Sequence, residues 1–182
     1  AALPGVITAQ GAQQLGPVNG RVALKGSRDN MTVGFQNVAM QGFGGTMALN
    51  GTVNDALDPT RRADLGFDIA NLAVGPMLAA FPNADVPPGL AQNLQNLTAK
   101  GSVKGSTSAP SVTLQQGTAQ AFGGTVTLVG TINEPMTPQA KYDMTASAKL
   151  PSLMQVLNAF YKPAGSIPGP VEFDNVKLVG DG

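Results

Sequence analysis

Apolar and polar residues alternate along most of this chain. Near the N-terminus, Val22 and Leu24 fall on one side of an extended backbone, whereas Arg21 and Lys25 fall on the other. Alternation with a period of two is typical of a β-strand with one buried and one solvated face. The stretches that show it are 18–25, 47–53, 63–69, 97–105, 126–132 and 142–148. The pattern therefore predicts a chain that is mostly β.

The apolar period changes in two short stretches, where apolar residues recur at the i, i+3, i+4, i+7 spacing of an amphipathic helix. These residues are Val74, Met77, Leu78 and Phe81 in the first stretch, and Leu153, Val156, Leu157 and Phe160 in the second. Each stretch follows a group of predicted strands. Leu15 and Leu94, which follow "AQQ" and "AQN", suggest a shorter helical turn that leads into each group of strands.

The chain repeats itself at a spacing of 79 residues. Phe43 begins "FGGTMALNGTVN", and Phe122 begins "FGGTVTLVGTIN". Each copy carries four strand-like stretches and then a helical one, so the fold class is predicted to be α+β, mostly β, in two tandem units of about four antiparallel strands and a short helix. The predicted units, within one domain of 1–182, are about 12–82 and 91–161, with a partial third unit at about 170–182 that begins with "VEFDNV".

The glycine pair in each "FGGT" raises the question of a phosphate-binding loop. Such a loop needs a Lys followed by Ser or Thr and then a helix, whereas "TVTLVGTIN" continues as a strand. The pair is better explained by a tight hairpin or a bulge, because glycine adopts the positive φ that a strand reversal needs. The less regular stretches "MTVGFQNVAM" and "PSVTLQQGTA" are predicted to contain β-bulges.

The composition excludes several classes of chemistry. The chain has no Cys and no His, so thiolate metal sites, thiol nucleophiles and histidine bases are excluded. Eleven Lys and Arg balance eleven Asp and Glu, and they are scattered, which argues against a nucleic-acid partner. Four acids, Asp55, Asp58, Asp64 and Asp68, are close in sequence, but their spacing fits neither a calcium loop nor a catalytic carboxylate pair. We expect no enzyme activity, no cofactor and no metal.

The ends of the sequence indicate a segment of a longer protein. No apolar run approaches the ~18 residues of a spanning helix, and the start "AALPGVITAQG" is neither an initiator Met nor a signal peptide. We expect any signal or membrane anchor to lie outside these residues.

The succession of motifs resembles the C-terminal region of the AsmA-like family over about residues 12–180. The matching features are the strand "GGTVTLVGTIN", the strand "YDMTASAKL", the helix "LPSLMQVLNAF" and the Gly-Lys-Gly strand restart "LTAKGSVKGS". The resemblance implies a curved, taco-like β-groove with an apolar interior, located in the bacterial periplasm and held at the inner membrane by an anchor outside this chain. It also implies a role in phospholipid transport between the inner and outer membranes and in outer-membrane biogenesis and homeostasis, without enzyme activity. Phospholipid acyl chains and other envelope proteins are the partners it implies.

The alternation itself gives a set of residues for such a groove. The apolar positions that would share its inner face are Val22, Leu24, Met47, Leu49, Val53, Leu65, Phe67, Ile69, Val103, Val126, Leu128, Ile132, Tyr142 and Met144. The two helical stretches would cap or plug the groove. Glycines on the same face, such as Gly51 and Gly130, leave room that a packed core would fill.

Two alternatives remain open from the pattern alone. The apolar faces can pack against one another into a closed core, as alternating sheets usually do. The chain is then a β-repeat scaffold or an interaction module for outer-membrane protein assembly, which contacts its partners through sheet edges.

Overall fold

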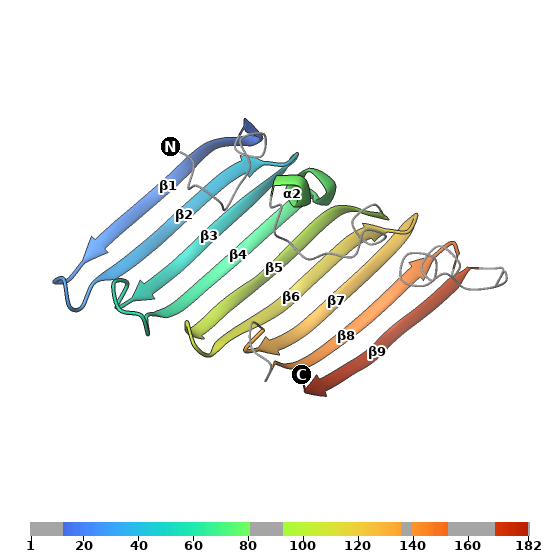
Figure 1. Cartoon of the computed structure of the whole chain (residues 1–182). Helices are drawn as coiled ribbons and strands as arrows, with labels where there is room; N and C mark the ends of the chain where they lie inside the picture. The colour runs from blue at the N-terminus through green and yellow to red at the C-terminus, as the bar shows by residue number, and fades with distance from the viewer. Residues whose placement is uncertain (1–12, 81–92, 136–139, 153–169, 182) are drawn as a thin grey trace.

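The structure is a computed structural model, which describes residues 13–80, 93–135, 140–152 and 170–181. These residues form one open antiparallel sheet in which nine strands follow in sequence order (Figure 1). The strands are β1 (Leu15–Lys25), β2 (Thr32–Gly42), β3 (Gly45–Asn54), β4 (Arg62–Ala73), β5 (Leu94–Ser106), β6 (Pro110–Ala121), β7 (Gly124–Asn133), β8 (Lys141–Leu150) and β9 (Val171–Asp181). The prediction of a mostly β chain with antiparallel strands is confirmed.

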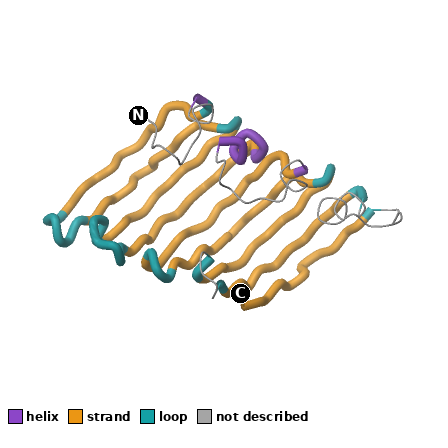
Figure 2. Tube along the Cα trace, viewed as in Figure 1, coloured by secondary structure: helices purple, strands orange, loops and turns teal. Residues whose placement is uncertain are grey.

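One short helix, α2 (Val74–Ala80), follows β4 and lies at one end of the sheet (Figure 2). We call this end the hairpin end, because the tight β2–β3 and β6–β7 turns also lie there. The opposite end, with the connections 26–31 and 55–61, is called the loop end. The first predicted helix is confirmed over residues 74–80, whereas Phe81 and the second helical stretch, with Leu153, Val156, Leu157 and Phe160, lie outside the described residues. Among the described residues, 13 and 93 are helical and stand just before β1 and β5, as the predicted turn leading into each unit requires. Leu15 and Leu94 themselves begin the strands.

The glycine pairs belong to hairpin turns, as predicted. Gly42 pairs with Gly45, so only Phe43 and Gly44 connect β2 to β3, with φ values of 50° and 73°. The β6–β7 turn is equivalent, with φ values of 52° at Phe122 and 72° at Gly123. Two positive φ angles are the mark of a type I′ turn, which matches the twist of the flanking strands. The sequence had suggested positive φ for the glycines alone, but the phenylalanines adopt it too.

Burial of the turn phenylalanines compensates for their left-handed backbone. Phe43 is buried with Leu72 and with Ala80 of α2, while Leu15 and Met47 pack against this cluster. Phe122 is buried in a second cluster with Ala121, Ala148 and Leu150. The cost of a positive φ in a bulky residue is of the order of 1–3 kcal/mol, which is comparable to the gain from burying one large apolar side chain. The same clusters close the hairpin end of the sheet.

The predicted bulges are present in β2 and β6. The β2–β3 register shifts between Phe35 and Val38, and the β6–β7 register shifts between Leu114 and Gly117. In β2 the extra residue is Asn37, which has a φ of 49° and donates its backbone N–H to Asn50 Oδ1 at 2.6 Å. The backbone group that leaves the ladder is therefore still hydrogen-bonded.

Positive φ angles recur at positions 79 apart in the sequence. The pairs are Gly26 and Gly105, Phe43 and Phe122, Gly44 and Gly123, Gly51 and Gly130, and Asp55 and Glu134.

Candidate functional site

The register of the sheet collects apolar side chains on one face. Residues that lie directly opposite each other on neighbouring antiparallel strands point to the same side, so a row of partners can be followed across the sheet. One row, from β1 to β9, is Val18, Met40, Met47, Ile69, Ala99, Gly117, Leu128, Ala146 and Val176. A second row is Val22, Phe35, Gly51, Leu65, Val103, Val112, Ile132, Tyr142 and Gly180. Neither row contains a charged residue, and we call this side of the sheet the apolar face.

All the groove residues proposed from the sequence lie on the apolar face. Leu49, Phe67 and Met144 belong to a third row, in which Phe67 pairs with Gly101 and Met144 pairs with Gly130 and Leu178. Leu24 and Val53 belong to a fourth row, linked by Val33 of β2. Val126 pairs with Ala148 nearer the hairpin end. The alternation of each strand therefore assigned these residues to the correct side.

The sequence prediction missed the apolar residues of β2, β6 and β9. These residues include Phe35, Val38, Met40, Val112, Leu114, Phe173, Val176 and Leu178. The bulges interrupt the alternation of apolar and polar residues, because one extra residue moves the rest of the strand out of phase with a period of two. The apolar residues after a bulge were therefore not recognised as members of the same face. Asn37 marks such a position in β2, and Asn175, with a φ of 52°, marks one in β9. Skipping one residue at each asparagine restores the alternation.

The opposite face of the sheet is polar. Asp64 pairs with Lys104 at 3.4 Å, and Lys177 pairs with Asp143 at 3.5 Å, with all four side chains more than 60% exposed. Ion pairs this exposed contribute about 0–1 kcal/mol each. Of the acids weighed as metal ligands, Asp64 and Asp68 lie on this solvated face, whereas Asp55 and Asp58 lie in the β3–β4 connection. Within the described ranges no group of three or more potential metal ligands lies close enough to hold a metal ion.

Burial on the apolar face is greatest beneath α2 and lowest on the edge strands β1 and β9. At the hairpin end, Leu72 is 2% exposed and Ala80 of α2 is 1% exposed. On the edge strand β1, Val18 is 64% exposed, Val22 is 56% exposed and Leu24 is 66% exposed. Isolated apolar residues on a surface are normal, but contiguous ones mark an interaction site. The apolar face is therefore covered beneath α2 and open to solvent on its edge strands.

A hollow of about 340 Å³ lies on the apolar face over β1 to β4. Its wall includes Val18 of β1, Val38 and Met40 of β2, Leu49 of β3 and Phe67 of β4. Apart from backbone atoms, this wall offers no hydrogen-bonding group to a ligand. The hollow can therefore hold a hydrocarbon chain but has no means of recognising a polar molecule.

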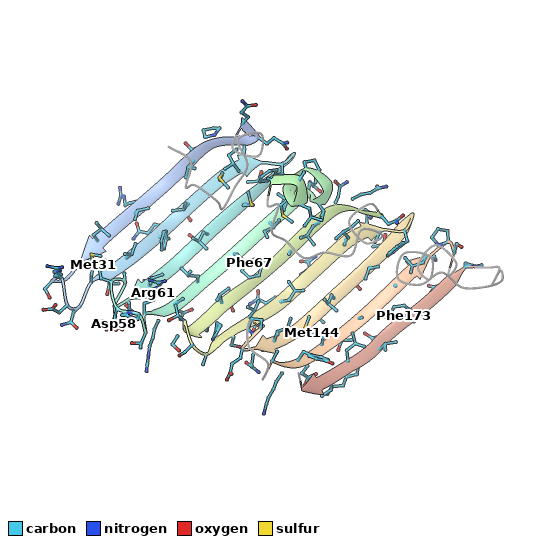
Figure 3. The ribbon with its side chains drawn as sticks, viewed as in Figure 1. Met31, Asp58, Arg61, Phe67, Met144 and Phe173 are labelled. Atoms are coloured by element: carbon cyan, nitrogen blue, oxygen red, sulfur yellow. The ribbon has the colours of Figure 1, made fainter. Side chains whose placement is uncertain are left out.

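Glycines allow aromatic side chains to lie flat on the sheet. A β-carbon added at Gly101 would lie 2.7 Å from Phe67 Cζ, so the Phe67 ring occupies the space above this glycine. The Tyr142 ring covers Gly180 of β9 in the same way. Figure 3 shows Phe67, Met144 and Phe173 on β4, β8 and β9. The aromatic residues therefore cover exposed glycine backbone and leave the face shallow.

The loop end carries a cluster of charged residues. Asp58 accepts hydrogen bonds from the Thr60 hydroxyl and the Thr60 backbone N–H, each at 2.6 Å from Oδ1. These bonds stabilise the carboxylate and lower the pKa of Asp58. A hollow of about 510 Å³ beside this turn is lined by Arg28, Asp29, Leu57, Asp58 and Pro59.

Comparison with models of protein families, with curated protein sequences and with solved structures finds no match for this chain. No helix in the described part of the chain has the length and apolar character needed to cross a membrane.

Proposed function

We propose that this chain is a non-enzymatic periplasmic segment of an AsmA-like envelope protein, and that its apolar face binds or conducts phospholipid acyl chains between the inner and outer membranes. The observation that carries the proposal is the unbroken apolar face, which includes residues from all nine strands and is partly open to solvent. Acyl chains suit it because they need apolar area and no polar contact. An anchor outside this chain would hold the protein at the inner membrane, and other envelope proteins are possible partners in outer-membrane biogenesis.

The size of the hollow over β1 to β4 supports a hydrocarbon ligand. A methylene group is close in size to a water molecule, whose share of liquid volume is about 30 Å³, so 340 Å³ corresponds to roughly ten methylenes. At about 0.8 kcal/mol per methylene moved out of water, their transfer contributes roughly 8 kcal/mol before the costs of association. This gain is comparable to the cost of association, so apolar contact would supply most of the binding free energy.

We further propose that the sheet derives from a duplicated unit and curves into a groove in the complete protein. The duplication is supported by the repeated "FGGT" motifs and by the positive φ angles that recur 79 residues apart. A partial third unit would begin with β9, in which Phe173 and Asn175 correspond to Phe35 and Asn37 of β2. Curvature would be favoured by the bulges, because each one bends its strand and increases the local twist.

A scaffold with a closed apolar core is the second candidate. The burial of Phe43 and Leu72 against Ala80 of α2 favours it, because part of the apolar face is already covered by the chain itself. In that case the remaining apolar face would be covered by protein, and the sheet edges would contact the partner proteins.

Photocrosslinking in cells separates the two candidates. A photoreactive residue at Leu128 points to the apolar face, whereas the same residue at its neighbour Val129 points to the polar face, where Val129 is 40% exposed. Lipid transport predicts crosslinked phospholipid from position 128 and none from position 129. Native mass spectrometry of the purified chain then identifies the lipid. Protein-only crosslinks at position 128, with lipid-free protein in the mass spectrum, would favour the scaffold.

A further inference from the structure

We propose that Met40 and Met47 form an oxidation site in the wall of the hollow, and that oxygen transfer from a peroxide to their sulfur atoms lowers the affinity of the hollow for hydrocarbon. This inference rests on the proposed lipid binding and adds to it a chemical modification that controls it. Three features of the described residues support it, namely the pairing of the two side chains, their access to solvent and the apolar wall around them.

The two methionines lie side by side on the apolar face. Met40 of β2 is directly opposite Met47 of β3, and both line the hollow of about 340 Å³. Side chains in such a cross-strand pair share one side of the sheet, with their β-carbons about 4.5–5.5 Å apart. Their outer neighbours in the same row are Val18 of β1 and Ile69 of β4. The two thioethers therefore occupy the middle of the row that crosses the hollow.

Solvent reaches this pair but not every methionine of the face. Met40 and Met47 are half-buried, and Val18 beside Met40 is 64% exposed. Met144 of β8, on the same face, is only 5% exposed. A peroxide dissolved in water must reach the sulfur atom, so methionine oxidation follows exposure. We expect Met40 and Met47 to be oxidised before Met144.

An apolar surface at this place does not require sulfur. The residues 79 positions further along the chain, Ala119 and Val126, form the corresponding cross-strand pair between β6 and β7. Neither of these side chains can be oxidised by a peroxide. The methionine pair thus gives the hollow over β1 to β4 a reactivity that the corresponding pair on β6 and β7 lacks.

The chemical step is an oxygen transfer. One oxygen of hydrogen peroxide forms a bond to the methionine sulfur while the O–O bond breaks, so that sulfur loses two electrons and the peroxide leaves as water. The product, methionine sulfoxide, is polar. Among the described residues that line the hollow, no side chain is a hydrogen-bond donor. A hydrocarbon chain that covers the sulfoxides therefore removes their water without replacing its hydrogen bonds.

This loss of hydration sets the size of the effect. Covering a polar group that has no hydrogen-bond partner weakens binding by roughly tenfold or more. Val18 is exposed at the β1 side of the hollow, so the sulfoxides keep part of their hydration. We therefore expect a loss of about tenfold in the affinity for a hydrocarbon chain when both sulfur atoms are oxidised.

Peroxide treatment followed by calorimetry tests the inference. Hydrogen peroxide is added to the purified chain, peptide mass spectrometry measures oxidation at each methionine, and isothermal titration calorimetry measures the affinity for laurate. The double variant Met40→Leu/Met47→Leu keeps apolar side chains of similar volume but cannot form these sulfoxides. Met31→Leu is the matched control, because Met31 precedes β2 at the loop end and does not line the hollow (Figure 3). Each protein is compared with itself before and after peroxide.

The expected results differ between the variants. Peroxide should lower the laurate affinity of the unsubstituted chain and of Met31→Leu about tenfold, and it should leave the double variant at its own starting affinity. Methionine sulfoxide reductase should restore the lost affinity, because sulfoxide formation is reversible. An equal loss in the double variant would overturn the inference. Unchanged affinity with both sulfoxides formed, or oxidation of Met144 at the same rate, would also overturn it.

Two further measurements keep this test separate from the proposed function. No laurate binding before peroxide would contradict lipid binding itself, whereas the order of oxidation would still test the access to the methionine pair. Circular dichroism checks that the oxidised chain keeps its strands. If it unfolds, Met40→Gln replaces oxidation, because it places an uncharged polar side chain at the same position. This variant should bind laurate about tenfold more weakly, and an unchanged affinity would overturn the inference.

Discussion

Replacing Leu49 by Asp distinguishes an open apolar face from a closed core. Leu49 lies in the middle of β3, lines the hollow, and has Val38 and Phe67 as its cross-strand partners. Its side chain is half-buried. Complete burial of a leucine side chain contributes about 1.5–3 kcal/mol, so half-burial contributes about 1 kcal/mol. The new carboxylate adds a similar cost beside apolar neighbours but keeps part of its hydration.

We therefore expect Leu49→Asp to lower the free energy of unfolding by about 2 kcal/mol. If the face were closed, the carboxylate would be buried without a partner, and the loss would be about 3–5 kcal/mol. Asn50→Asp is the matched control. Asn50 points to the polar face, and an aspartate there can still accept the hydrogen bond from the Asn37 N–H. This control should change stability by no more than about 0.5 kcal/mol.

Urea unfolding followed by circular dichroism gives the two stabilities, and lipid crosslinking measures contact with the ligand. An open face predicts a folded Leu49→Asp protein that has lost its lipid contact. A loss of about 4 kcal/mol or more would show that the face is closed. Unchanged stability together with unchanged lipid contact would refute the assignment of Leu49 to a functional face.

Two further predictions concern the frame of the sheet. Gly51→Ala should lower the free energy of unfolding by more than about 2 kcal/mol, because Gly51 has a φ of 125° and an added β-carbon would lie 2.1 Å from the Asp64 carbonyl oxygen. Gly75→Ala, in α2 with nothing within 4 Å of the added β-carbon, should instead raise the free energy of unfolding by up to about 1 kcal/mol. Thermal unfolding measures both changes. Thr60→Val should raise the pKa of Asp58 in an NMR titration. The lowered pKa means that the ionised Asp58 stabilises the folded state. This stabilisation is present above the unfolded-state pKa and is lost as the pH falls through the folded-state pKa. An unchanged pKa of Asp58 in Thr60→Val would exclude the Thr60 hydroxyl as the cause of the shift.

The sequence by itself determined which residues share a face within each strand that has a regular alternation. A strand places successive side chains on opposite sides whatever its neighbours are. Val22 and Leu24, for instance, could be assigned to the same side before any pairing was known. The hairpin turns were equally local, because a glycine pair between two alternating stretches favours a two-residue turn. The first helix was also predicted, since Val74, Met77 and Leu78 repeat within one short segment.

The tertiary structure decided how these local units combine. Strand order and register depend on hydrogen bonds between residues far apart in the chain, and no local pattern encodes them. The bulges at Asn37 and Asn175 brought β2 and β9 into phase with the apolar face, which the alternation alone did not reveal. The positive φ of Phe43 is sustained by the burial of its ring with Leu72 and α2. The contact of the Phe43 ring with β4 and α2 therefore stabilises a turn that its local sequence alone does not.

The covered part and the open part of the apolar face also exist only in the folded chain. Leu24 and Leu72 are the same residue type in similar strand patterns, yet one is 66% exposed and the other is 2% exposed. The difference arises because Leu24 lies on the edge strand β1, where Val18 is also 64% exposed, whereas Leu72 lies on the inner strand β4 and packs with Phe43 and Ala80 of α2. The sequence therefore determined the chemistry of the face, because side-chain direction follows from the backbone of each strand. Only the fold decided which part of that face remains open, because burial depends on what packs against it.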